Sequence, residues 1–136
     1  MTLVVDASVT LAWCFEDEAT PQTEAVLDRL QEDEAVVPVL WQLEIANMLL
    51  QAERRRRMTE AQATRFVTLL KQLPIRLDLS PTELTAVLSL GRRYGLSAYD
   101  AAYLSLAERL AAPLATLDAN LASASRAAGV TLLIEG

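Results

Sequence analysis

The chain opens on TLVVDAS, residues 2–8, in which apolar residues give way to an aspartate and a serine. The run from Thr2 to Val5 is short, apolar and β-branched, which is typical of a buried strand. Asp6 and Ser8 are residue types that begin helices, and the apolar stretch from Val9 to Phe15 follows them. The sequence therefore predicts a strand that turns directly into a helix, with an aspartate where the strand ends.

The same alternation continues to the end of the chain. Further strands are predicted at 35–38, 75–77, 114–117 and 130–134, and helices at 20–31, 40–55, 59–73, 80–94, 98–111 and 118–128. Short strands that are apolar on both faces and alternate with helices favour a three-layer α/β/α sandwich around a mainly parallel sheet. No linker or repeat divides the chain, so we expect a single domain over residues 1–136.

Several predicted helices begin at recognisable capping residues. Thr59 and Gln62 have the spacing of a capping box, and Ser97 precedes Asp100 by the same three residues. The run from Ser80 to Glu83 combines a cap, a proline and a glutamate, which predicts a helix start at Pro81. Gly95 suits the left-handed position that closes a helix.

Composition excludes many kinds of active site. The 136 residues include no histidine, one cysteine and only four glycines, and the net charge is −6. Histidine-dependent catalytic triads, histidine-ligated zinc and cysteine-held iron–sulfur clusters are therefore excluded. The only lysine, Lys71, is not part of a phosphate-binding loop, and no glycine pattern of a dinucleotide site occurs. Catalysis would have to use carboxylates, hydroxyls, arginines and an added cation.

The chain carries no obvious membrane or export signal. Its longest stretches without charge are nine residues each, far short of the roughly 20 needed to cross a bilayer. Asp6 interrupts the only early apolar run, and no basic leader precedes it. We therefore expect a cytoplasmic protein without a membrane partner, in which the lone Cys14 is a small buried apolar residue.

Two aspartates follow predicted strands directly. Asp6 follows the first strand and Asp118 follows the strand at 114–117, so both should emerge at the carboxyl edge of a parallel sheet. Ligands bind at this edge in open α/β sheets. The alternative is that each aspartate only caps the helix that follows it.

Two further acids lie on the apolar sides of predicted helices. Asp100 shares its side with Tyr103 and Leu104, and Glu44 lies between Trp41 and Met48. A carboxylate that faces a core needs a partner. Asp100 could instead complete a capping box, and Glu44 could hydrogen-bond to a neighbour such as Asn47.

Four converging carboxylates would repel one another strongly. At about 4 Å and an effective dielectric constant near 20, each pair costs ~4 kcal/mol. Since no buried lysine or histidine is available, the natural counter-charge is a hard divalent cation, Mg²⁺ or Mn²⁺. Such a cluster is suited to metal-assisted hydrolysis of a phosphodiester.

Four motifs resemble those of a known family. They are VVDASV at 4–9, LEIAN at 43–47, SAYDAAYL at 97–104 and ATLDANL at 115–121. In this order they resemble a PIN-domain ribonuclease, specifically the VapC-like toxins of type II toxin–antitoxin systems. The resemblance covers nearly the whole chain and implies an α/β/α fold and Mg²⁺- or Mn²⁺-dependent endonucleolytic cleavage of RNA.

The resemblance also implies roles for individual residues. The catalytic acids would be Asp6, Glu44, Asp100 and Asp118, of which Asp6, Asp100 and Asp118 would hold one or two metal ions. Ser8, Thr116 and Asn120 match supporting positions. Some members have a further acid after the last aspartate, whereas Ala119 and Asn120 follow Asp118 here. A homodimer and a cognate antitoxin are implied, with the apolar helices between Thr20 and Arg55 as contact surfaces.

The cationic residues form two small groups. Arg54, Arg55, Arg56 and Arg57 are consecutive, and Arg92 and Arg93 form a second pair. Such residues could bind RNA phosphates, or they could remain solvated and complement the negative end of a helix dipole. Aromatic residues are few: Trp13, Trp41 and Tyr103 are predicted in the core, and Tyr99 near the cleft beside Asp100.

Other functions fit the sequence less well. A receiver domain would have paired acids after its first strand, and a phosphatase of the aspartyl-phosphate type would have an Asp-x-Asp pair, whereas Asp6 stands alone. A catalytically silent binding module on the same fold, or a PIN nuclease outside toxin–antitoxin systems, remains the alternative to a toxin.

Overall fold

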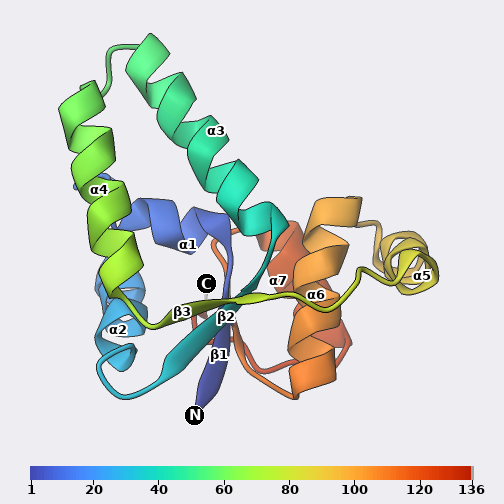
Figure 1. Ribbon diagram of the computed structural model, residues 1–136. Coiled ribbons are helices and arrows are strands. Elements are labelled where there is room, and N and C mark those ends of the chain that lie inside the picture. Colours follow the sequence, from blue (N-terminus) through green and yellow to red (C-terminus); the bar gives the residue numbers. More distant parts are fainter. Residues whose placement is uncertain (136) are drawn as a thin grey trace.

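A computed structural model describes residues 1–135 (Figure 1), so Gly136, the last residue of the predicted domain, lies outside the described residues. The elements are β1 (Thr2–Val5), α1 (Ala7–Ala12), α2 (Pro21–Arg29), β2 (Glu34–Pro38), α3 (Leu40–Arg54), α4 (Glu60–Gln72), β3 (Ile75–Asp78), α5 (Leu84–Tyr94), α6 (Ala98–Leu110), β4 (Leu114–Ala115) and α7 (Ala119–Ala127).

The four strands form one parallel sheet in the order β3-β2-β1-β4. Val4 in the central strand β1 pairs with Val36 of β2 on one side and with Leu114 of β4 on the other. These three residues are buried and belong to the hydrophobic core. The predicted parallel sheet is thus confirmed, and the carboxyl ends of its strands lie at one edge.

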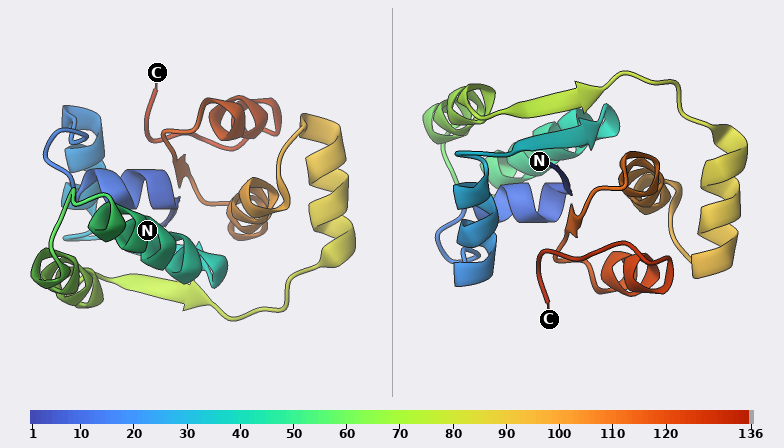
Figure 2. Two further views of the ribbon diagram at one scale, coloured as in Figure 1. Left: turned by 90° about the horizontal axis from the view of Figure 1, so that it is seen from above. Right: turned by 90° about the horizontal axis from the view of Figure 1, so that it is seen from below.

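Helices cover both faces of the sheet. The two views in Figure 2 place α1, α2 and α4 on one side and α6 and α7 on the other, with α5 beyond α6. Tyr103 and Leu104 of α6 and Val26 of α2 are buried in the core that these layers enclose. The structure therefore has the predicted three-layer α/β/α arrangement, and none of its described helices is both long and apolar enough to span a membrane.

The α3–α4 hairpin rises from the carboxyl edge of the sheet (Figure 1). Arg57, in the turn between the two helices, holds it to the segment after α1. Its guanidinium forms ion pairs with Asp17 at 2.8 Å and Glu18 at 3.2 Å, and its central carbon lies 3.9 Å from the centre of the Phe15 ring. Arg57 is thus committed to tertiary contacts.

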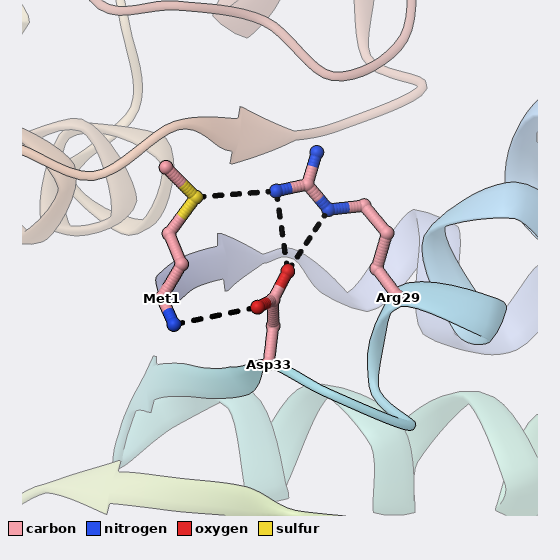
Figure 3. A network of polar contacts seen from close by, with 3 residues as sticks. All are labelled: Met1, Arg29 and Asp33. Carbon is pink, nitrogen blue, oxygen red and sulfur yellow. Dashed lines mark hydrogen bonds and ion pairs between the residues drawn. The ribbon is translucent and has the colours of Figure 1, made fainter.

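The first strand is fixed at its amino end by a small polar network, shown in Figure 3. The Met1 ammonium lies 3.3 Å from one oxygen of Asp33, and Arg29 donates to the other oxygen from 3.3 Å. Arg29 also contacts the Met1 sulfur at 3.3 Å. These contacts hold the start of β1 beside the start of β2, at the opposite edge from the acids.

Most predicted helix ends are confirmed. The Thr59 and Gln62 side chains exchange hydrogen bonds with each other's backbone N–H groups, which completes a capping box. The Ser97 hydroxyl accepts from the Asp100 N–H at 3.2 Å. Gly95 ends α5 with a φ of 67°, a backbone conformation that favours glycine.

One predicted helix start and two predicted strands differ from the structure. Helix α5 begins at Leu84 and not at Pro81, and the Ser80 N–H before it is bound to the Asp78 carboxylate at 3.4 Å in a local turn. The segment 130–134 is not a strand and makes only a single bridge, between Leu132 and Leu114. The strand beside it, β4, has only two residues, Leu114–Ala115, where the sequence predicted a strand over 114–117.

Candidate active site

Asp6 lies where β1 ends, and its side chain is only 5% exposed. One carboxylate oxygen accepts hydrogen bonds from the Ser8 hydroxyl at 2.6 Å and from the Val9 N–H at 3.1 Å, which caps α1. The other oxygen accepts from the Thr116 hydroxyl. Asp6 is therefore both a helix cap, the alternative raised by the sequence, and the centre of a polar network.

Two hydroxyl groups join the ends of β1 and β4. The Ser8 hydroxyl donates to Asp6 and accepts from the Leu117 N–H at 2.9 Å. The Thr116 hydroxyl likewise donates to Asp6 and accepts from the Asp118 N–H at 3.0 Å. Each hydroxyl thus donates to the buried Asp6 carboxylate and accepts from a backbone N–H in the loop after β4. Both supporting residues therefore contact the site.

Asp118 begins α7 from the same edge of the sheet. Its carboxylate accepts the Leu121 N–H at 2.9 Å, which confirms the capping interaction. The side chain remains partly exposed. Asn120, the third predicted supporting residue, is exposed, and its side chain makes no hydrogen bond to any residue of the described chain.

Glu44 is half-buried on α3 and is held by a residue from another layer. Tyr103 of α6 donates its hydroxyl hydrogen to Glu44 Oε1 at 2.6 Å. The partner is thus Tyr103 and not Asn47, which is exposed. Burial raises the pKa of Glu44, the Tyr103 hydrogen bond partly offsets this, and the charge of Asp100 raises it further.

Asp100 is half-buried in the first turn of α6. Its backbone N–H is bound by Ser97, but the reciprocal half of the capping box is not formed within residues 1–135. Its carboxylate accepts no hydrogen bond from any described residue. Burial raises the pKa of Asp100, and the charges of Asp118 and Asp6 raise it further.

The four predicted acids are electrostatically coupled. Burial is the largest cause of the raised pKa of Asp6, and Glu44 adds to it, although bonds from Ser8, Thr116 and Val9 oppose the shift. Asp100 is affected by both Asp6 and Asp118, and it affects Glu44 in turn. Four acids from four separate segments therefore lie near enough to repel one another at one edge of the sheet.

This donor set suits a hard divalent cation in its chemistry. Within residues 1–135, no three acidic or cysteine side chains are already gathered around a single point. Mg²⁺ does not need three protein ligands around one point, because it keeps several waters and binds through one or two carboxylates together with substrate phosphates. The unengaged carboxylate of Asp100, flanked by Asp6 and Asp118, fits such a site.

The first group of candidate RNA-binding arginines lies at the far end of α3 from Glu44. Arg54 is ten residues beyond Glu44 on α3, about 15 Å along the helix at 1.5 Å per residue. Arg54, Arg55 and Arg56 are exposed, whereas Arg57 has the tertiary contacts described above. The second pair, Arg92 and Arg93, lies in the final turn of α5 and is also exposed.

The predicted placement of the aromatic residues is largely confirmed. Trp41 and Tyr103 are buried, Trp13 is packed against the core, and Tyr99, beside Asp100, is 63% exposed. One polar contact could not be predicted from the sequence. The Thr10 hydroxyl donates to the Asp6 carbonyl at 2.9 Å and accepts from the Trp41 indole N–H at 3.1 Å, which ties α3 to the site.

Comparisons with known proteins agree with this arrangement. The PIN domain family model matches residues 3–127. Ribonuclease VapC3 from Pyrobaculum aerophilum is 32% identical over 124 residues, which are 90% of this chain and 93% of that protein.

Solved structures show the same fold. PAE2754 from Pyrobaculum aerophilum has a TM-score of 0.72 at 24% identity and covers 98% of this chain and 92% of its own. VapBC2 from Rickettsia felis, bound to a DNA fragment from their promoter, has a TM-score of 0.71 at 12% identity, covering 97% of both chains. A toxin–antitoxin complex from Klebsiella pneumoniae has a TM-score of 0.67 at 15% identity, covering 98% and 99%. Since the family match spans most of the sequence and a relative aligns over nearly its full length, the chain belongs to the PIN domain family and is related to the VapC ribonucleases.

Proposed function

We propose that this chain is a Mg²⁺- or Mn²⁺-dependent endoribonuclease and acts as the toxin of a toxin–antitoxin pair. One observation carries the catalytic part of the proposal. Burial raises the pKa of Asp6, Glu44 and Asp100, and in each case the charge of at least one other acid of the set, which includes Asp118, raises it further. Related Ribonuclease VapC3 supports RNA as the substrate.

Asp6, Asp100 and Asp118 would hold one or two ions in this proposal. A bound divalent cation supplies a lowered pKa for an attacking water and stabilises charge on the phosphate. The chain's own contribution is orientation, because Ser8, Thr116 and the Val9 N–H fix the Asp6 carboxylate before substrate arrives.

Glu44 would act on the attacking water. Its Oε1 is engaged by Tyr103, while Oε2 accepts no hydrogen bond from the described residues. A raised pKa brings a carboxylate closer to the range in which a general base is effective. Glu44 Oε2 would take a proton from the water as its oxygen bonds to phosphorus. The bond from phosphorus to the 3′ oxygen would break, and that oxygen would take a proton from solvent water, leaving 5′-phosphate and 3′-hydroxyl ends.

Exposed arginines outside the acidic site would bind the phosphates of the RNA. Arg54, Arg55 and Arg56 form no ion pair with residues 1–135 and are exposed, so they are available to phosphates. Arg92 and Arg93 offer a second exposed pair on α5. Contacts of this kind give affinity that falls steeply as salt increases.

An antitoxin and a second copy of the chain are the proposed protein partners. Exposed apolar side chains on α3, namely Leu43, Met48 and Leu50, offer a surface that a protein partner could cover. Leu43 is 74% exposed and directly precedes Glu44, so a partner bound there would lie beside the acids. A structurally similar chain from Klebsiella pneumoniae was solved in a toxin–antitoxin complex.

An RNA-cleavage assay tests the proposal. Purified protein is incubated with total cellular RNA in Mg²⁺, in Mn²⁺ and in EDTA, beside an Asp100→Asn variant. We expect cleavage in either metal and none in EDTA or in the variant. Cleavage that persists in EDTA would contradict metal dependence, whereas no cleavage under any condition would favour a silent binding module.

A second experiment separates a toxin from a nuclease with another role. Brief induction of the chain in growing cells is followed by mapping of new RNA 5′ ends. A toxin should arrest growth and produce discrete new 5′-phosphate ends, and Asp100→Asn should do neither. Normal growth with an active enzyme would indicate a PIN nuclease outside toxin–antitoxin systems.

A further inference from the structure

The Tyr103 hydroxyl links the core of the protein to the candidate catalytic acids. Tyr103 is only 1% exposed, and its ring belongs to the hydrophobic core. Its hydroxyl donates to Glu44 Oε1 at 2.6 Å from a position 59 residues away in the sequence. We propose that Tyr103 is a positioning residue, which holds the Glu44 carboxylate in its working orientation. This inference rests on the proposed nuclease function.

Glu44 needs such a support because of where it lies. It is carried by α3, which projects from the edge of the sheet as one arm of the α3–α4 hairpin (Figure 1). Within the described chain, the Tyr103 hydroxyl is the only group that donates a hydrogen bond to the Glu44 carboxylate. A glutamate side chain has three rotatable bonds, so without this contact it would sample several rotamers.

Tyr103 is well suited to impose one orientation. Its ring is buried in the hydrophobic core, to which Leu104 and Val5 also belong, so the hydroxyl has a fixed position. Asp6 is held by Ser8, Thr116 and a backbone N–H, which are three independent donors. Glu44 has one, and losing it should affect the orientation of Glu44 far more than the loss of one donor would affect Asp6.

Tyr103→Phe removes the hydroxyl and keeps the ring. We expect kcat for RNA cleavage to fall about 10- to 100-fold, the range found when a residue supporting a catalytic ligand is lost. KM should stay within about twofold, because Glu44 would act on the attacking water and not on binding of the RNA backbone. Tyr94→Phe on α5 is the matched control and should leave both constants unchanged.

A double-mutant cycle shows whether Tyr103 acts through Glu44. Single-turnover cleavage is measured for wild type, Tyr103→Phe, Glu44→Gln and the double variant. If the inference is right, Tyr103→Phe should change the rate less than about threefold in the Glu44→Gln background. The effects of the two substitutions on the free energy of urea unfolding should also be non-additive. This second measurement does not depend on nuclease activity.

The outcomes distinguish the inference from the function on which it rests. Wild-type protein that cleaves no RNA, together with a non-additive unfolding cycle, would refute the nuclease and leave the contact in place. With an active wild type, an unchanged kcat in Tyr103→Phe or an equal loss in both backgrounds would overturn the positioning role. A Tyr103→Phe chain unfolded at the assay temperature would overturn it as well, because the hydroxyl would then serve stability.

Discussion

The Thr116 hydroxyl donates a hydrogen bond to the Asp6 carboxylate across 110 positions of sequence. Both residues are buried, and they follow adjacent strands of the sheet. Because the same hydroxyl accepts the Asp118 N–H, one side chain fixes the first acid and the start of the loop that carries the last. Hydrogen bonds at the carboxyl edge of the sheet thus fix the positions of Asp6 and of the loop that carries Asp118.

Replacing Thr116 should therefore destabilise the fold. Thr116→Val keeps the shape but leaves the Asp6 oxygen and the Asp118 N–H without their partner, so we expect a loss of about 1–3 kcal/mol in unfolding free energy. Thr116→Ser is the control that keeps the hydroxyl and should lose less. Urea denaturation at pH 7 measures both. Equal stability of Thr116→Val and wild type would show that this hydrogen bond contributes nothing.

Asp100→Asn should remove activity and strengthen the fold. We expect kcat/KM for RNA cleavage to fall by about 100-fold, because Asp100 is one of the three acids proposed to hold a cation. The melting temperature should rise at pH 7, since one of several mutually repelling charges is removed. Glu108→Gln, an exposed change on the same helix, is the control for both measurements. Full activity in Asp100→Asn would refute its assigned role.

The stability gain in Asp100→Asn should depend on pH in a defined direction. Burial and the neighbouring acids raise the pKa of Asp100 above 3.8 in the folded protein, so ionisation disfavours folding. Wild-type stability therefore falls as pH rises from about 3.8 through the folded pKa, and the variant avoids this loss. Unfolding curves at pH 7 and near pH 3.5 should show a gain only at pH 7. A gain of the same size at both would exclude charge repulsion as its cause.

Much of the fold could be predicted because its signals are local. Strands β1 and β2 contain short apolar runs, and residues such as Thr59 and Ser97 mark helix starts by their own side chains. The segment 130–134 is apolar as well, yet it forms only the single bridge to Leu114, because strand pairing depends on tertiary contacts that a local pattern does not contain.

Some residues of the candidate site could likewise be predicted from local patterns, whereas their partners could not. Asp6 and Asp118 could be assigned to one edge because each follows a predicted parallel strand, and Asp100 could be assigned because helical periodicity turned it inward. Tyr103 was predicted only as a core residue, since periodicity gives the burial of a ring and not the partner of its hydroxyl. The Thr10 bridge to Trp41 was missed for the same reason, because its partners lie on different elements.

The Arg109–Asp78 ion pair, which lies outside the candidate active site, should contribute to stability in a pH-dependent way. Arg109 donates to Asp78 at 2.7 Å, and this bond lowers the pKa of Asp78 below 3.8. The stabilisation is present above pH 3.8 and is lost as pH falls through the folded pKa. Because the pair is partly exposed, Asp78→Asn should cost up to about 1 kcal/mol at pH 7 and progressively less below pH 3.8. Urea denaturation across this pH range measures it, and a cost that does not change with pH would contradict the ion pair.

Divalent metal should stabilise the folded chain. A single Mg²⁺ site filled at 100 times its dissociation constant adds about 2.7 kcal/mol to the unfolding free energy. Melting curves in MgCl₂, MnCl₂ and sodium chloride of equal ionic strength separate this effect from screening. An identical melting temperature in all three salts would argue strongly against a cation site among the acids.

We propose that Asp6, Asp100 and Asp118 bind a divalent cation beside Glu44. Titration with Mn²⁺, followed by the electron paramagnetic resonance signal of the free ion, counts the ions bound per chain without RNA and without turnover. We predict one or two bound ions for wild type and for Glu108→Gln, and weaker or incomplete binding for Asp100→Asn. Equal Mn²⁺ binding by all three proteins, or none by wild type, would contradict the account.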